Sequence, residues 1–136
     1  MTATSVALLG FVAWLIFLVL SLGIVRTSLV MTGKRAANSF NSSGEDMEPF
    51  GYRLTRAHAN CYENLPAAAA LLLYAIATGQ TEVTNGLAYI FLGARIAQSI
   101  AHLISTNRSF VLIRFAFFAI QLAIMVIWLL SFFSIV

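Results

Sequence analysis

A strip of charged and amide side chains opens one of the apolar segments of this chain. Residues 53–66 are Arg-Leu-Thr-Arg-Ala-His-Ala-Asn-Cys-Tyr-Glu-Asn-Leu-Pro. On a helix, spacings of three, four and three residues put the strip's ionisable and amide groups on one face: Arg53, Arg56, Asn60 and Glu63. Guanidinium groups hold carboxylates through paired hydrogen bonds, so this face favours an anionic, peptide-like ligand.

A second polar stripe follows on the next apolar segment, where Arg95, Gln98 and His102 are spaced three and four residues apart. If the two segments are antiparallel helices, Glu63 and Arg95 each lie about 15 Å in from the same end, at 1.5 Å per residue. A lone charge inside a membrane costs about 3 kcal/mol. We therefore expect a buried Glu63–Arg95 ion pair, within one subunit or between two, that serves helix register or function rather than net stability.

Composition assigns the chain to a membrane. It has 136 residues, of which 60% are hydrophobic and 10% are charged, whereas soluble domains are about 45–50% apolar and about 25% charged. The net charge of +3 is too diffuse for a nucleic-acid-binding face. The single cysteine, Cys61, excludes an internal disulfide and favours a packing role. No metal-binding cluster is expected.

The apolar segments predict an all-α membrane protein of one domain, residues 1–136. A spanning helix needs about 20 residues, and four candidates occur, at about 4–31, 52–78, 83–105 and 108–135. Asn107 and Ser109 are suitable N-cap residues for the last helix. Short turns at 79–82 and 105–107 predict antiparallel neighbours in an up-down four-helix bundle. Residues 32–51 have the composition of a polar loop.

Basic residues flank the first and third connections, whereas the N-terminus, the 79–82 turn and the C-terminus carry none. Loops rich in Lys and Arg stay in the cytoplasm. We therefore expect a multi-pass protein with both termini outside the cytoplasm, in a bacterial inner membrane, with the endoplasmic reticulum left open. The residues that set this orientation are Arg26, Lys34, Arg35, Arg53, Arg56 and Arg108.

The segment from Arg56 to Pro66 resembles the second-helix signature, Arg-Ala-x-x-Asn-x-x-Glu-x-x-Pro, of the MAPEG family, membrane-associated proteins in eicosanoid and glutathione metabolism. Gly-Ala-Arg-Ile at 93–96, followed by His-Leu at 102–103, is similar to the third helix of that family. Ile-Arg-Phe at 113–115 resembles the opening of its fourth helix. The resemblance covers essentially the whole chain.

This resemblance implies a homotrimer with a glutathione site at each subunit interface, open to the cytoplasm. Carried over by position, Arg56, Asn60 and Glu63 bind the backbone and carboxylates of glutathione. Further candidates are Arg53, then Arg35 or, as a weaker choice, Arg26 from the end of the first helix, and Arg95, Gln98 and His102 from the third.

The arginine that stabilises the glutathione thiolate in the family maps onto Arg114, with Arg108 as a competing alignment. A free thiol titrates near pH 8.5. A neighbouring guanidinium lowers the pKa of a thiol because positive charge favours the anion. The thiolate then attacks a lipophilic electrophile or hydroperoxide dissolved in the membrane lipid.

One position departs from the family pattern. His102 stands where several members have a tyrosine, and no tyrosine follows Tyr89. Three functions therefore stay open: a glutathione transferase or peroxidase, a non-catalytic lipid- or glutathione-binding protein, and a transporter in which Glu63, Arg95 and His102 form a path.

Overall fold

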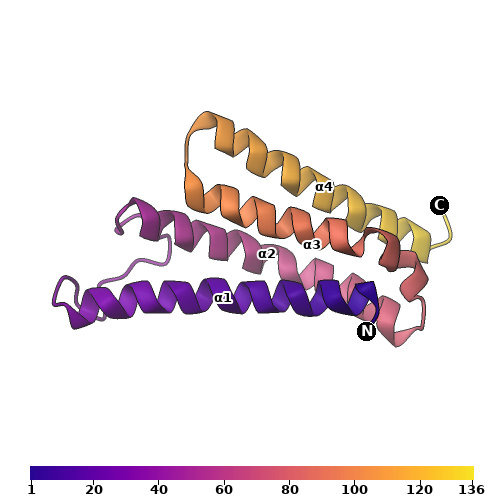
Figure 1. Cartoon of the computed structure of the whole chain (residues 1–136), viewed down its shortest axis with the longest axis horizontal. Helices are drawn as coiled ribbons and strands as arrows, with labels where there is room; N and C mark the ends of the chain where they lie inside the picture. The colour runs from indigo at the N-terminus through magenta and orange to yellow at the C-terminus, as the bar shows by residue number, and fades with distance from the viewer.

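Four long helices follow one another up and down the molecule in the computed structural model, which describes residues 1–136 (Figure 1). They are α1 (Ala3–Met31), α2 (Pro49–Ala77), α3 (Thr81–Ile104) and α4 (Arg108–Phe132). The expected up-down four-helix bundle is confirmed. Relative to the expected bounds, α2 begins earlier, at Pro49, and α4 ends earlier, at Phe132.

Local sequence explains where the helices begin and end. The side chain of Asn107 accepts a hydrogen bond from the backbone N–H of Phe110 at 3.1 Å, so Asn107 is the N-cap of α4. Pro49 occupies the first position of α2, where its missing N–H costs nothing. Gly79 has a φ of +70°, which lets the chain reverse within the tight turn between α2 and α3.

The helices pack through small side chains and one aromatic cluster. The rings of Phe11 and Phe91 lie 6.0 Å apart, and those of Phe91 and Trp128 lie 5.3 Å apart, which ties α1, α3 and α4 together. On α2, Ala57 and Ala68 are fully buried and let the neighbouring helices approach closely. By contrast, α4 makes little contact with α2 and diverges from it toward the end where α4 begins (Figure 1).

Three of the helices, α1, α3 and α4, are long and apolar enough to cross a membrane. Large apolar side chains such as Leu20, Ile90 and Leu122 face outward from them. The chain is a multi-pass integral membrane protein. α2 is excluded from the set of apolar spans because its first half carries the polar strip.

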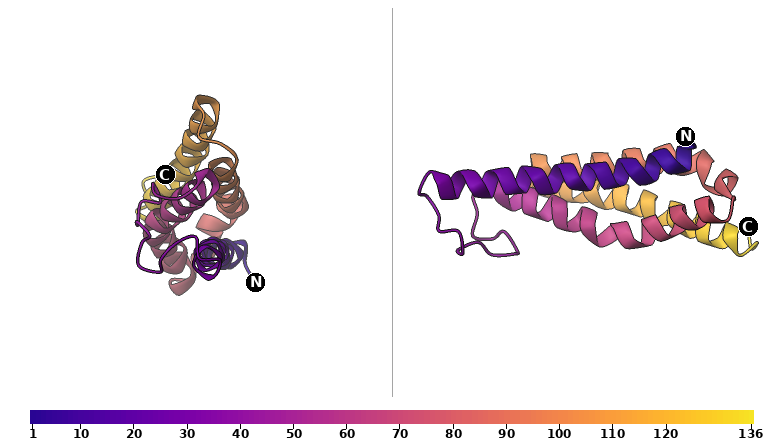
Figure 2. Two further views of the ribbon diagram at one scale, coloured as in Figure 1. Left: turned by 90° about the vertical axis from the view of Figure 1, so that its left-hand side faces the viewer. Right: turned by 90° about the horizontal axis from the view of Figure 1, so that it is seen from below.

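The two ends of the bundle differ in their connections. The long loop between α1 and α2 and the turn between α3 and α4 lie at one end, called here the loop end (Figures 1 and 2). Both chain termini and the turn between α2 and α3 lie at the other end (Figure 2). The basic residues used above to predict orientation therefore gather at the loop end.

Candidate functional site

A cleft of about 770 Å³ opens at the loop end, where α4 diverges from α2. The loop before α2, the first turns of α2, the last turn of α3 and the start of α4 all contribute to it. Its lining is Glu45, Met47, Pro49, Tyr52, Arg53, Arg56, His102, Thr106 and Arg114. Three arginines against one glutamate leave this cleft with a net formal charge of +2.

The two arginines of α2 that line the cleft differ in their hydrogen bonding. The Nε of Arg53 donates to the backbone oxygen of Leu103 at 2.7 Å, which satisfies one of the free carbonyls at the end of α3. Arg56, one turn further along α2, is exposed and makes no hydrogen bond or ion pair within the chain. The guanidinium of Arg56 is therefore free to bind a ligand carboxylate.

His102 of α3 and Arg114 of α4 are in direct contact in the lining of the cleft. The Nη1 of Arg114 donates to the Nδ1 of His102 at 2.8 Å. A guanidinium only donates, so Nδ1 must accept and the imidazole is neutral, with its proton on Nε2. This contact orients both side chains and leaves a second donor, Nε2–H, on His102.

A deeper polar layer lies beneath the cleft. Arg95 is 1% exposed, and its Nη1 donates to the Oδ1 of Asn60 at 2.7 Å. The guanidinium also lies 5.3 Å from the centre of the Phe11 ring. Its Nε and Nη2 have no hydrogen-bond partner. A buried cation held by an amide and a ring is a costly arrangement that neutral core residues avoid.

The expected Glu63–Arg95 ion pair does not form within the chain. Glu63 lies on the exposed surface of α2, and the structure contains a single ion pair, between Arg35 and Asp46. Asn60 and Glu63 point about 60° apart around the helix, so only Asn60 turns toward α3. Placing both residues on one broad face was too coarse to decide which of them meets Arg95.

Gln98 is also buried in this deeper layer. The Nε2 of Gln121 donates to the Oε1 of Gln98 at 2.9 Å and to the backbone oxygen of Phe117 at 2.8 Å. Sequence reasoning missed Gln121, although it is the only polar side chain in the apolar run from Phe115 to Leu130. An amide side chain in an apolar membrane helix needs a partner inside the protein, so the position of Gln121 could have indicated a buried polar contact.

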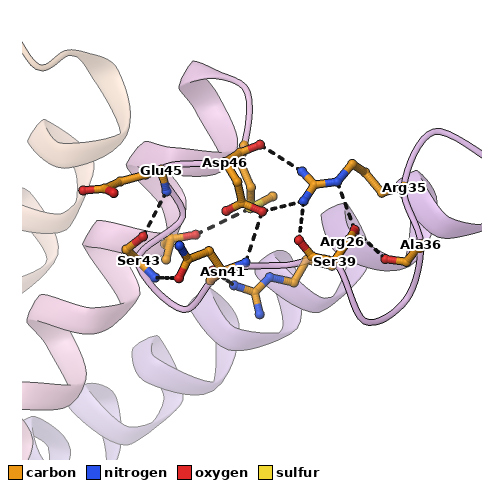
Figure 3. Close-up of polar contacts among 10 residues, drawn as sticks. Arg26, Arg35, Ala36, Ser39, Asn41, Ser43, Glu45 and Asp46 are labelled. Atoms are coloured by element: carbon orange, nitrogen blue, oxygen red, sulfur yellow. Dashed lines mark hydrogen bonds and ion pairs between the residues drawn. The ribbon is translucent and has the colours of Figure 1, made fainter.

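Arg35 is engaged in the loop rather than in the cleft (Figure 3). Its guanidinium donates to Ser39 and to the backbone oxygen of Asp46, and it forms the ion pair with the Asp46 carboxylate. The Arg35 guanidinium lowers the pKa of Asp46 through this hydrogen bond. Arg26 lies beside the same loop, 5.5 Å from the centre of the Phe40 ring. Both arginines hold the loop in place.

Of the two arginines considered for the thiol, only Arg114 lines the cleft. Arg108 is exposed at the first position of α4. Asn60, Glu63, Arg95 and Gln98 also lie outside the cleft lining of the single chain. Their expected roles in ligand binding stay predictions.

The loop contributes lining residues that helical spacing did not indicate. Glu45 and Met47 have no periodic pattern to identify them, because they lie in irregular structure before α2. Tyr52 could have been predicted from the sequence, since it lies four residues before Arg56 on the same helical face.

The model of the MAPEG family matches residues 3–134, nearly the whole chain. The chain belongs to the MAPEG family. It is therefore a glutathione-related membrane protein, and the resemblance of the α2 signature reflects membership. Neither the curated proteins nor the solved structures contain a match to it. In this MAPEG protein, the signature residue Arg56 lies in the cleft, while the signature residue Glu63 lies outside it.

Proposed function

We propose that this MAPEG protein binds glutathione in the loop-end cleft and activates its thiol for attack on lipophilic electrophiles or hydroperoxides. The observation that carries the proposal is the convergence of Arg53, Arg56 and Arg114 on one cleft in a chain of this family. An excess of unpaired positive charge at a membrane protein's polar end suits a ligand with two carboxylates.

The cleft fits a tripeptide in size and chemistry. Pockets for small ligands are roughly 300–1,000 Å³, and this cleft is about 770 Å³. Arg56 has no internal partner and offers its whole guanidinium to a carboxylate. Arg53 is held by the carbonyl of Leu103 through Nε alone, which leaves its two terminal nitrogens for a second carboxylate.

Arg114 is the residue we assign to the thiol. A thiol beside its guanidinium loses its proton more easily than the usual pKa of about 8.5 allows, because the positive charge favours the anion. His102 holds Arg114 in position through Nδ1 and presents Nε2–H as a further donor. This neutral histidine replaces the hydroxyl donor of the family members that have a tyrosine.

We also propose the assembly and orientation implied by the family resemblance: a homotrimer with its loop end in the cytoplasm. Glu63 is exposed on α2 and has no partner in its own chain. A neighbouring subunit that packs on this face gives Glu63 and the nearby Asn60 access to a shared ligand. The proposed location is a bacterial inner membrane.

Calorimetric titration of the purified protein in lipid nanodiscs tests the binding step. Glutathione should bind the wild type, and Arg56→Ala should weaken binding about tenfold, the loss of one charge-assisted hydrogen bond. Lys34→Ala is the matched control, since Lys34 is exposed in the loop and lies outside the cleft. The proposal is wrong if the wild type gives no heat of binding with glutathione and none with a glutathione conjugate.

A non-catalytic glutathione- or lipid-binding protein is the second candidate, and His102 in the position of the tyrosine favours it. Normal binding without the ultraviolet absorbance of a thiolate, and without conjugation across a panel of electrophiles, identifies this case. The transporter hypothesis has less support, because Glu63 is exposed on the outer surface while Arg95 is enclosed by the bundle.

A further inference from the structure

Tyr52 is the one tyrosine that lines the cleft, and it has no part in the binding of glutathione proposed above. It lies in the first turn of α2, four residues before Arg56 and therefore on the same face of the helix. Its backbone N–H donates to the oxygen of Glu48 at 3.0 Å, so Tyr52 is already part of the regular helix. The side chain is half-buried, and its hydroxyl is hydrogen-bonded to no residue of the chain. The hydroxyl is therefore positioned by a helix and free to meet a ligand.

Two contacts join the elements that carry Tyr52 and Arg114 around the cleft. Arg53, the neighbour of Tyr52, donates to the backbone oxygen of Leu103 at 2.7 Å and ties α2 to the last turn of α3. His102, the neighbour of Leu103, contacts Arg114 of α4 at 2.8 Å. A substrate that reacts at a thiol beside Arg114 therefore enters the same cleft as the Tyr52 hydroxyl.

No other side chain of the lining has a proton to give at neutral pH. The three arginines keep theirs, because a guanidinium does not deprotonate in proteins. Glu45 is a carboxylate at neutral pH and has already lost its proton. His102 is neutral with Nδ1 occupied by Arg114, so loss of the Nε2 proton would leave an anionic ring. The remaining lining residues have no proton of comparable acidity: Met47, Pro49 and Thr106.

We propose that Tyr52 is the proton donor of the cleft and protonates the oxygen that leaves when a lipophilic hydroperoxide is reduced. The inference rests on the proposed function and adds a catalytic residue for one class of its substrates. The O–O bond of the hydroperoxide breaks as its outer oxygen bonds to the glutathione sulfur. The inner oxygen leaves as an alkoxide and takes the phenolic proton of Tyr52.

The acidity of the two hydroxyl groups favours this transfer. A phenol loses its proton at about pH 10, whereas an alkyl alcohol resembles water, for which the corresponding value is about 15.7. An alkoxide released without a donor would have to take its proton from water in the transition state. A positioned acid removes that cost and typically contributes about 100-fold or more to the rate.

The atoms and electrons of the step balance with glutathione as the only reductant. The glutathione sulfur is oxidised to a sulfenic acid while the hydroperoxide is reduced to an alcohol. A second glutathione converts the sulfenic acid to the disulfide and releases water. The Tyr52 phenolate recovers its proton from water, because the cleft is open at the loop end.

Two substrates that differ in their leaving group test the inference on the full-length protein in lipid nanodiscs. Cumene hydroperoxide releases an alkoxide, which needs a proton, whereas 1-chloro-2,4-dinitrobenzene releases chloride, which needs none. Tyr52→Phe keeps the ring and removes the hydroxyl. It should lower kcat/KM for the hydroperoxide about 100-fold and change kcat/KM for the chloride-releasing substrate by less than about twofold. The calorimetric affinity for glutathione and the thiolate absorbance of the bound thiol should equal those of the wild type.

Two matched variants interpret the result. Tyr89→Phe removes the hydroxyl of a tyrosine that is exposed on α3 outside the cleft, and it should keep both rates. Thr106→Val removes the other neutral hydroxyl of the lining and should keep the ratio of the two rates. If Thr106→Val lowers the hydroperoxide rate alone and Tyr52→Phe does not, the donor is Thr106 and the inference is wrong.

The remaining outcomes also decide. Equal loss of both rates in Tyr52→Phe assigns the residue to the shape of the cleft and overturns the inference while the proposed function stands. The inference is also wrong if Tyr52→Phe keeps the hydroperoxide rate, or if the wild type binds glutathione and reduces no hydroperoxide. A wild type that binds no glutathione overturns the proposed function, and the inference with it. Far-ultraviolet circular dichroism of each variant confirms that the helices are intact.

Discussion

The two ends of the bundle use polar side chains in opposite ways. At the terminal end, Thr4, Thr84 and Asn85 join α1 to α3 through short contacts: 2.6 Å between the two threonine hydroxyls, and 2.8 Å and 3.0 Å from the hydroxyl and N–H of Thr4 to the Asn85 amide. At the loop end, Arg56 and Glu45 have side chains without internal partners. The first cluster is neutral and closed, whereas the second is charged and open.

The difference separates a structural role from the binding role that we propose for the cleft. Polar groups in a membrane protein must find partners inside the protein, and the hydroxyl of Thr4 does so with Thr84 and Asn85. The cleft leaves Arg56 and Glu45 without ion-pair partners at the loop end of the bundle, where we propose that a ligand supplies them. Arg95 lies between these cases, since it is buried like the first cluster and incompletely paired like the second.

The largest effect is expected for Arg114→Ala. Removing the guanidinium we assign to the thiol should lower kcat/KM for conjugation about 100-fold, as loss of one preorganised donor does elsewhere. The measurement is the conjugation rate with a lipophilic electrophile, with thiolate absorbance of the bound glutathione as a second readout. A comparable loss in Arg108→Ala, with Arg114→Ala active, would reverse the assignment made from the cleft.

Arg95→Ala should lower the free energy of unfolding by about 2–3 kcal/mol, because it opens a cavity and leaves the half-buried Asn60 amide without its partner. Arg95→Met keeps most of the volume and removes a charge with two unpartnered nitrogens, so its cost should be about 1 kcal/mol or less. Denaturant unfolding in mixed micelles measures both. Equal losses in the two variants would mean that the charge itself stabilises the layer.

Thr4→Val tests the closed cluster. The variant keeps the shape of the side chain and removes the hydroxyl, so the free energy of unfolding should fall by about 1 kcal/mol. Glutathione affinity should stay at the wild-type value, because Thr4 lies in the first turn of α1, at the end of the bundle opposite the loop that lines the cleft. Ser5→Ala is the matched control, since the hydroxyl of Ser5 bonds only to Thr2. Altered glutathione affinity in Thr4→Val would contradict the separation of the two ends.

The smallest effect concerns pH and the loop. Arg35 holds the pKa of Asp46 below its model-peptide value of 3.8. A depressed folded-state pKa contributes stability that is present above about pH 4 and lost as the pH falls through the folded value. Asp46→Asn should therefore remove part of the decline in loop stability that the wild type shows as the pH falls below about 4. Limited proteolysis of the loop by an acid-active protease measures this decline. Glu48→Gln should leave the wild-type pH profile unchanged.

Much of the architecture followed from composition and periodicity. Apolar runs of spanning length and short polar turns define α1, α3 and α4, because the bilayer requires long helices whose backbone groups are satisfied internally. The N-cap at Asn107 was also predictable, since its amide side chain precedes an apolar run. The expected bounds of α2 and α4 differed from the structure only near their ends, where capping and local turns decide.

The lining of the cleft was only partly predictable from the sequence. Arg53, Arg56 and His102 were indicated by helical spacing, and Arg114 by resemblance, and all four line the cleft. The expected pairing of Glu63 with Arg95 within one chain was wrong, because a helical face 80° wide contains both Asn60 and Glu63 and the rotation of α2 against α3 selects between them.

By itself, the sequence determined that this chain crosses a membrane as a helical bundle with basic residues at one end, since hydropathy and charge are properties of the residues alone. Tertiary structure decided which charges remain free. The loop turns Asp46 toward Arg35 and leaves Glu45 at the cleft, and α4 brings Arg114 within 2.8 Å of His102. Such choices depend on side-chain direction after packing, which no spacing rule specifies.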